Sequence, residues 1–246
     1  MGIGNGVGGM IENIRQYIIK HNLDRPEFYY ILGTLFGDAF FTKFDNEGYP
    51  HEIRINTVDE KLAKKFIKAV ESLEGRYTYH IYSQHEKALG KKPIHRVCVY
   101  GFRNLGVYIK DLYKMVYLPL YNNPYLLLEL LDSKEKIVSF IKGLYECEGC
   151  FYIGGNKTPK WQIQFTSSNY ELLIVVKELL KRLGFEFHIS KPYKSRISTK
   201  PFWQLRMSGR LTNTERMQRF FELIRPVIKN PEDYLLRKRK KGEIKI

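Results

Sequence analysis

The sequence predicts an α+β protein that contains two pseudo-symmetric copies of one αββαββα unit. Three observations lead to this prediction. A short helical segment with small residues occurs twice, each copy is followed by the same order of strand-like and helix-like patterns, and the predicted strands alternate apolar and polar residues. A chain of 246 residues, of which 43% are hydrophobic, is long enough for one large or two small cores.

The duplicated segment is the strongest of these signals. Residues Ile31–Ala39 and Ile141–Gly149 each form an apolar stretch with small residues four positions apart, closed by one carboxylate. The two carboxylates are Asp38 and Glu148, which lie 110 residues apart (148 − 38). Small side chains at this spacing share one helix face and let two helix backbones approach closely. The predicted helix-interface residues are Gly33, Gly37, Gly143 and Cys147.

Packing of the two segments against each other would place Asp38 and Glu148 side by side. Adjacent carboxylates repel each other unless a cation lies between them. A divalent ion that prefers oxygen ligands could bind between the two carboxylates, and Mg²⁺ is the expected ion. A single G-x-x-x-G segment is more often ordinary tight packing. Two copies with the acid in the same place, each followed by an aromatic strand-like stretch, favour a functional site.

The first unit is expected to begin at Pro26, which precedes the first duplicated helix. Strands, an amphipathic helix, two further strands and a last helix follow. These are expected over residues 27–38 (helix), 40–44 and 52–57 (strands), 59–73 (helix), 77–83 and 94–100 (strands), and 104–117 (helix).

The second unit repeats this order, and Ser133 is expected to cap its first helix. Its strands are expected near 150–153, 161–166, 185–191 and 202–208, and its other helices over 169–183 and 212–224. The predicted domains are an N-terminal extension (1–25), the first unit (26–118), a linker (119–133), the second unit (134–230) and a basic tail (231–246).

The net charge of +15, from 41 Lys and Arg against 26 Asp and Glu, indicates a polyanionic partner. Nucleic acid is the first candidate and an anionic membrane surface the second. No apolar run reaches about 18 residues and no signal-peptide pattern opens the chain, which argues against secretion and membrane spanning. We therefore expect a cytoplasmic, nucleoid-associated protein without a membrane partner.

The three cysteines, Cys98, Cys147 and Cys150, form neither an even disulfide framework nor a set of four zinc ligands. Cys147 and Cys150 do form a C-x-x-C pattern, which is typical of redox or metal sites. We favour structural roles instead, with Cys147 as a small helix-interface residue and Cys150 at the start of a strand.

Alternation along the strands predicts which side chains face away from the core. Trp161, Ile163 and Phe165 are expected to be buried, and Glu52 is expected to face outward. The outward set is rich in side chains that hydrogen-bond to base edges and phosphates. The expected nucleic-acid-binding residues are Thr42, Asn46, Arg54, Asn56, Arg76, His80, Arg96, Lys160, Gln162, Gln164, His188, Gln204 and Arg206.

The duplicated motif resembles that of single-chain LAGLIDADG homing endonucleases, and of archaeal intron-encoded members in particular. The resemblance extends from about Glu27 to Asn230. The second motif, Phe140–Gly149, is the more specific of the two. The first departs from the consensus at three positions but keeps both glycines and the acid; the departures are Thr34, Phe36 and Ala39.

This resemblance implies a monomer in which two LAGLIDADG units form a saddle of antiparallel sheets around two central motif helices. Such proteins bind a long, nearly asymmetric double-stranded DNA site, hydrolyse both strands across the minor groove and leave short 3′ overhangs. Asp38 and Glu148 would be the catalytic residues and the ligands of Mg²⁺ or Mn²⁺, with the carbonyl groups of Gly37 and Cys147 as further ligands. The metals would polarise the scissile phosphates and activate water.

Part of the family's catalytic pattern is missing. Many relatives place a Gln at the end of the second strand, where this chain has Asn56-Thr57 and Thr166-Ser167. They also place a basic residue near the metal, for which the candidates here are Lys229, Arg103 and Arg210.

Two alternatives share the same charge and fold. The first is an RNA maturase that binds its own intron RNA and assists splicing. The second is a DNA-binding regulator on the same scaffold, which would usually carry a helix-turn-helix module that the sequence does not show. The two retained acids favour the nuclease.

Overall fold

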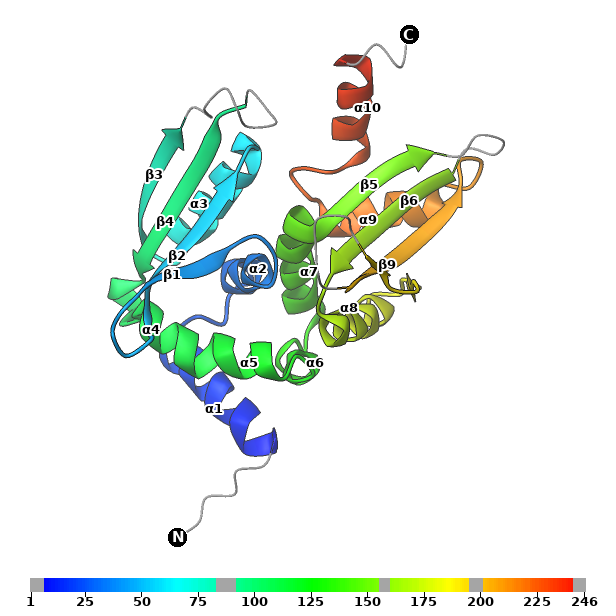
Figure 1. The fold of residues 1–246 in the computed structure, drawn as a ribbon. Helices are drawn as coiled ribbons and strands as arrows, with labels where there is room; N and C mark the ends of the chain where they lie inside the picture. The colour runs from blue at the N-terminus through cyan, green and yellow to red at the C-terminus, as the bar shows by residue number, and fades with distance from the viewer. Residues whose placement is uncertain (1–6, 83–91, 155–159, 195–200, 241–246) are drawn as a thin grey trace. The chain divides into compact units, whose positions relative to one another are not determined.

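The computed structural model describes residues 7–82, 92–154, 160–194 and 201–240 (Figure 1). The chain divides into two compact units, residues 1–143 and 144–246. Each unit contains one antiparallel sheet with helices, which confirms the predicted α+β class. Within the described ranges, no helix is long and apolar enough to cross a membrane.

The sheet of the first unit has the strand order β1-β2-β4-β3. Helix α2 precedes β1 and helix α3 connects β2 to β3. The elements up to the end of the sheet are α1 (Val7–Lys20), α2 (Pro26–Leu35), β1 (Phe40–Phe44), β2 (Pro50–Thr57), α3 (Glu60–Ser72), β3 (Arg76–Tyr82) and β4 (Ile94–Gly101). They are followed by a 3₁₀ turn (Arg103–Leu105), α4 (Ile109–Leu112), a π turn (Tyr113–Tyr117), α5 (Leu118–Asn122), α6 (Leu126–Leu130) and α7 (Lys134–Glu148).

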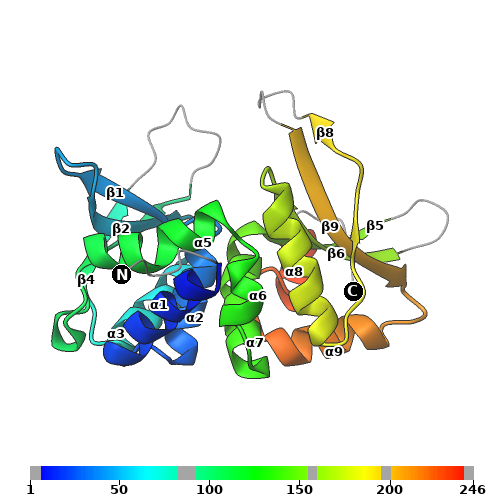
Figure 2. The same cartoon turned by 90° about the horizontal axis from the view of Figure 1, so that it is seen from below.

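Helix α3 covers one face of the first sheet, and Figure 2 shows it on that side. Its apolar side chains, among them Leu62 and Phe66, are buried together with Ile53 and Ile55 of β2. Asp59 caps the helix by accepting a hydrogen bond from the main-chain N–H of Lys61. The residues of β2 that alternate with the buried ones, among them Arg54 and Asn56, lie on the opposite face of the sheet.

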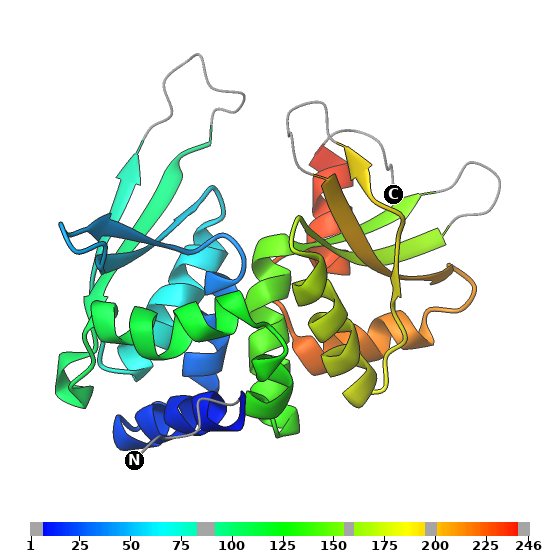
Figure 3. The same cartoon turned by 60° about the horizontal axis from the view of Figure 1, so that its bottom comes forward.

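The second unit has the strand order β5-β6-β9-β7, with β8 paired to β9. Its elements after α7 are β5 (Gly149–Gly154), β6 (Lys160–Ser167), α8 (Tyr170–Arg182), β7 (His188–Ile189), β8 (Tyr193–Lys194), β9 (Pro201–Arg210), α9 (Glu215–Ile224) and α10 (Pro231–Lys240). Figure 3 shows α10 beside β5, where the hydroxyl of Tyr234 donates to the carbonyl oxygen of Ile153 at 2.6 Å.

The core of the second unit is aromatic. Trp161, Ile163 and Phe165 of β6 are buried, as the alternation predicts. The ring of Tyr145 packs edge-on against Phe165 and Phe220, each with a centroid distance of 5.4 Å. These contacts join β6 to α7 and α9, and they leave the other face of the sheet outside the core.

The first duplicated helix is shorter than predicted. It ends at Leu35 rather than at Asp38, and the N–H groups of Gly37 and Ala39 both donate to the carbonyl oxygen of Thr34. Asp38 therefore lies in an exposed turn before β1. Glu148, in contrast, is the last residue of α7, and β5 begins directly after it.

Two other predicted elements differ from the structure. The single helix expected over 104–117 is broken into a 3₁₀ turn, a short helix and a π turn, because Gly106 adopts a left-handed conformation and Pro119 lacks an N–H donor for a regular helical turn. The strand expected over 185–191 is reduced to His188–Ile189, because Phe185 and Phe187 are buried against Phe220. Ser83, part of a predicted strand, and Lys241 lie outside the described residues.

Candidate nucleic-acid interface

The outward face of the first sheet carries rows of polar side chains. Residues that are paired across neighbouring strands point to the same side of a sheet. One row runs across Phe40, Arg54, Cys98 and Thr78, and a second across Asn56, Arg96 and His80. Ile53, Ile55 and Val97 lie between these rows and are buried on the opposite face. The structure thus brings Arg54, Asn56, Arg96 and His80 together on one face.

The other predicted contacts of this unit surround these rows. Thr42 lies on β1 opposite Glu52. Asn46 is exposed in the turn between β1 and β2, and Arg76 is exposed at an irregular position before a register shift in β3.

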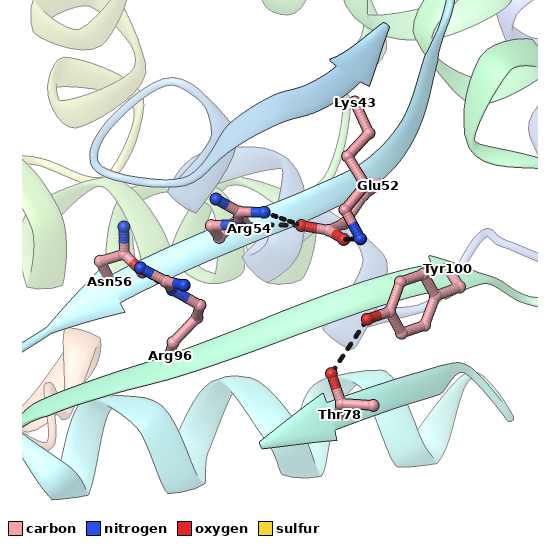
Figure 4. A network of polar contacts seen from close by, with 7 residues as sticks. All are labelled: Lys43, Glu52, Arg54, Asn56, Thr78, Arg96 and Tyr100. Atoms are coloured by element: carbon pink, nitrogen blue, oxygen red, sulfur yellow. Dashed lines mark hydrogen bonds and ion pairs between the residues drawn. The ribbon is translucent and has the colours of Figure 1, made fainter. Parts of the chain in front are cut away.

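The sequence predicts that Glu52 faces outward. Glu52 does lie on the outward face of the sheet, but its side chain is not accessible to solvent there. Its side chain is 0% exposed because Lys43 and Arg54 cover it. Nζ of Lys43 lies 2.7 Å from Oε2, while Nε and Nη2 of Arg54 lie 2.9 and 2.7 Å from Oε1 (Figure 4). Burial raises the pKa of Glu52, but the hydrogen bonds from Lys43 and Arg54 outweigh it and hold the pKa below its ordinary value.

Arg96 is also held in place. Its Nε donates to Oδ1 of Asn56 at 3.0 Å, and its guanidinium lies 4.5 Å from the centroid of the Tyr82 ring. Two contacts on one guanidinium restrict its rotamers. Thr78 and Tyr100 form a hydroxyl pair at 3.0 Å on the neighbouring strands (Figure 4).

The second sheet has equivalent rows with different chemistry. One row runs across Cys150, Gln164, Arg206 and His188. The flanking rows contain Tyr152, Gln162 and Ser208, then Thr166 and Gln204, and finally Gly154, Lys160 and Arg210. The six predicted contacts of this unit therefore lie on one face: Lys160, Gln162, Gln164, His188, Gln204 and Arg206.

The glutamines of this face form a directed chain of hydrogen bonds. The hydroxyl of Tyr152 donates to Oε1 of Gln162 at 2.7 Å, and Nε2 of Gln162 donates to Oε1 of Gln164 at 2.8 Å. Because its oxygen already accepts a bond from Gln162, Gln164 is oriented with its amide donors available.

The end of α7 is tied to the segment after α9. The hydroxyl of Tyr145 donates to the carbonyl oxygen of Lys229 at 2.9 Å, and the buried carboxylate of Glu146 accepts from the N–H of Val227 at 2.7 Å. Nζ of Lys229 donates to the carbonyl oxygen of Cys147. Of the three basic candidates, Lys229 is the one placed beside the residue that precedes Glu148. Arg103 and Arg210 are exposed at other elements.

The last residues of β2 and β6, where many LAGLIDADG homing endonucleases have a Gln, form hydrogen bonds with the main chain. Thr57 Oγ1 accepts from the N–H of Asp59 at 3.0 Å, and Ser167 Oγ accepts from the N–H of Asn169 at 3.0 Å. Both hydroxyls thus shape the turn into the next helix, at the same place in each unit.

Gly143 of α7 lies against the backbone of α2. A Cβ built on it would overlap the carbonyl oxygen of Tyr30 and lie 3.0 Å from the main-chain nitrogen of Thr34. Only glycine allows this approach. Gly33 is buried within α2, Gly37 is half-buried after it, and Cys147 is buried near the end of α7. All three cysteines are free thiols.

The comparisons with known proteins point to one fold. Residues 135–225 match the family model of the LAGLIDADG-like domain. This LAGLIDADG-like region extends from α7 to the end of α9, and residues 1–134 of the first unit lie outside it. No curated protein is similar enough to count as a match.

Solved structures cover most of the chain. The N-terminal LAGLIDADG domain of DUF199/WhiA is 12% identical, with a TM-score of 0.51, over 96% of this chain and 97% of that one. Full-length DUF199/WhiA from Thermatoga maritima is 13% identical, with a TM-score of 0.50, over 93% of this chain and 66% of that one. The homing endonuclease I-DmoI in complex with DNA and Ca is 19% identical, with a TM-score of 0.49, over 86% and 97%. The LAGLIDADG fold is thus shared at low sequence identity.

Proposed function

We propose that this protein is a monomeric, site-specific DNA endonuclease of the homing type, which binds a long asymmetric duplex and hydrolyses both strands with divalent metal. The observation that carries the proposal is the position of the two acids. Asp38 lies two residues before β1, and Glu148 directly precedes β5, so each acid stands close to the start of its unit's sheet. A net charge of +15 supports a nucleic-acid partner in the nucleoid.

DNA would lie along the outward faces of the sheets. A two-stranded ribbon fits the major groove of B-DNA, and Arg, Gln, Asn and His side chains bond to base edges there. Lys160, exposed at the start of β6, would contact phosphates instead.

The residues at the end of α7 fit a hard cation. The carbonyl oxygen of Cys147 already accepts a hydrogen bond from a cationic group, the ammonium of Lys229, and a carboxylate follows in the chain. Carboxylate and carbonyl oxygens are the ligands that Mg²⁺ and Mn²⁺ prefer. Within the described ranges, no three His, Cys, Asp or Glu side chains are placed to hold a metal. Main-chain oxygens, those of Gly37 and Cys147, would therefore complete the set of Asp38 and Glu148.

When bound, the metal would polarise the scissile phosphate and lower the pKa of a bound water. The protein's own residues would provide position and charge. Asp38 and Glu148 would hold the metal, and the ammonium of Lys229 would stabilise negative charge at the phosphate. The cut would leave short 3′ overhangs.

Binding and cutting are tested in two steps. Full-length protein in EDTA selects sites from a random duplex library, and the selected DNA is then incubated with Mg²⁺ or Mn²⁺. We expect cuts in both strands with metal and none in EDTA. Asp38→Asn and Glu148→Gln should abolish double-strand cutting and retain binding. Normal cutting by either variant would overturn the metal assignment. Binding to intron RNA, measured in parallel, without any DNA cutting would favour the maturase.

A further inference from the structure

We propose that the two units read different bases, with the first sheet reading guanine through Arg54 and Arg96 and the second reading adenine through Gln162, Gln164 and Gln204. Glu52 acts in this scheme as a positioning residue for Arg54. The inference rests on the proposed DNA binding and specifies its substrate.

The register of the sheets makes the units directly comparable. Phe40 pairs with Arg54 in the first sheet, and Cys150 pairs with Gln164 in the second. Thr42 pairs with Glu52 as Tyr152 pairs with Gln162. Asn56 pairs with Arg96 as Thr166 pairs with Gln204. Three positions thus change together between the units: Glu52 to Gln162, Arg54 to Gln164, and Arg96 to Gln204.

In both units, side chains two residues apart on the same strand are hydrogen-bonded at equivalent positions, but only the pair in the first unit is charged. Arg54 donates twice to Glu52, and Gln162 donates once to Gln164, so both units link the same two positions. The first link is an ion pair and the second is a neutral amide pair. This duplication of a linked pair is what indicates that the pair has one role in both units.

The geometry of Arg54 suits guanine. A guanidinium has five N–H donors, and Glu52 engages one on Nε and one on Nη2. The remaining donors include the parallel pair at the Nη1–Nη2 edge, which matches O6 and N7 of guanine. The carboxylate of Glu52 also offsets the charge of Arg54, which weakens its attraction to phosphate relative to a base edge. Asn56 and Tyr82 fix Arg96 in a comparable way.

The glutamines suit adenine. A carboxamide presents one donor and one acceptor, which match N7 and N6 of adenine. Tyr152 orients Gln162, and Gln162 orients Gln164, so the amides are aligned before DNA arrives. Arg206 pairs with Gln164 in the second sheet, just as Cys98 pairs with Arg54 in the first. Arg206 therefore provides an internal control, because its neighbour differs from that of Arg54.

The test is selection of bound duplexes by full-length protein in EDTA, followed by sequencing. We expect guanine-enriched positions that lose on the order of tenfold enrichment with Arg54→Gln or Arg96→Gln, and adenine-enriched positions that do so with Gln164→Ala. Glu52→Gln should weaken the same guanine position as Arg54→Gln. It should also steepen the slope of log affinity against log salt by about 1, since one positive charge is released. The paired exchange of Glu52→Gln with Arg54→Gln should convert that guanine position to adenine.

The outcomes separate the two proposals. Selected sites whose Arg54 position is not guanine, or whose guanine preference survives Glu52→Gln with an unchanged salt slope, would overturn this assignment alone. A library without any enriched sequence would overturn the proposed function as well. Because Glu52 is buried and its variant could misfold, Arg54→Gln and Arg206→Gln are read in parallel, and Arg206→Gln should change a different position from either Arg54→Gln or Arg96→Gln.

Discussion

The ammonium of Lys229 donates a hydrogen bond to the main-chain carbonyl oxygen of Cys147, the residue before Glu148. Lys229 holds this position in a left-handed backbone conformation, with φ of 60°, which is unfavourable for a residue with a side chain. The carbonyl oxygen of the same residue accepts the hydroxyl of Tyr145. Main chain and side chain of Lys229 are thus both fixed to the last turn of α7.

Replacement of Lys229 by Gly should lower cutting without unfolding the protein. Glycine removes the ammonium and tolerates the positive φ, so the lost bond is offset and the melting temperature should change little. We expect the single-turnover cutting rate to fall on the order of 10²-fold, while DNA affinity in EDTA stays within a few-fold. Lys181→Met, at an exposed site on α8, is the charge-matched control. An unchanged rate would assign Lys229 a structural role only.

Gly143→Ala should destabilise the first unit. The added methyl group would overlap the carbonyl oxygen of Tyr30, and backbone cannot move aside as a flexible side chain can. The expected loss in the free energy of unfolding is about 1–3 kcal/mol, measured by urea titration. Gly8→Ala in α1 is the control, because no described atom lies within 4 Å of its Cβ, and it should gain up to about 1 kcal/mol from helix propensity. Equal effects of the two variants would contradict the close contact.

Stability should fall at acid pH through Glu52. The folded protein holds the pKa of this carboxyl below its ordinary value of 4.5, so the unfolded chain binds the proton more readily. The stabilisation is present above pH 4.5 and is lost as pH falls through the lower folded pKa. Thermal melting between pH 3 and 7 should therefore show a steeper acid decline for the wild type than for Glu52→Gln. Parallel curves would show that Glu52 does not carry this dependence.

Lys160→Ala should weaken DNA binding by nearly the same factor on every sequence. Its side chain is exposed at the start of β6, in the row that also contains Arg210. A lost phosphate contact reduces the salt slope of binding by about 1, whereas a lost base contact changes sequence preference. Fluorescence anisotropy over a range of salt concentrations measures the slope, with Lys181→Ala as the control. A changed base preference would mean that Lys160 reads a base edge.

The alternation of the strands was sufficient to predict the sheets and their faces. Ile53, Ile55, Trp161, Ile163 and Phe165 are all buried. This worked because a period of two residues is set by backbone geometry alone. It failed for the accessibility of Glu52, since the residues that cover it, Lys43 and Arg54, do so through side-chain pairing that no periodicity encodes.

The ends of helices and the long-range contacts were harder to predict. The early end of α2 depends on Gly37 and Ala39 sharing one carbonyl group. The bonds from 227–229 to α7 join residues more than 80 positions apart, and the sequence contains no local signal for them. The sequence did identify Lys229 as one of three basic candidates, but only the fold distinguishes it from Arg103 and Arg210.

The hydrogen bonds between α7 and residues 227–229 also constrain the order in which the chain folds during synthesis. During synthesis α7 leaves the ribosome well before Val227 does. The carboxylate of Glu146 therefore lacks the N–H donor of Val227, which is 81 residues downstream, until that residue has been added. The last turn of this helix, and with it the backbone that leads to Glu148, can reach its final state only after residues 227–229 have been synthesised. A chain synthesised only as far as β9 therefore contains every strand of its sheets before the bonds that fix the end of α7 can form.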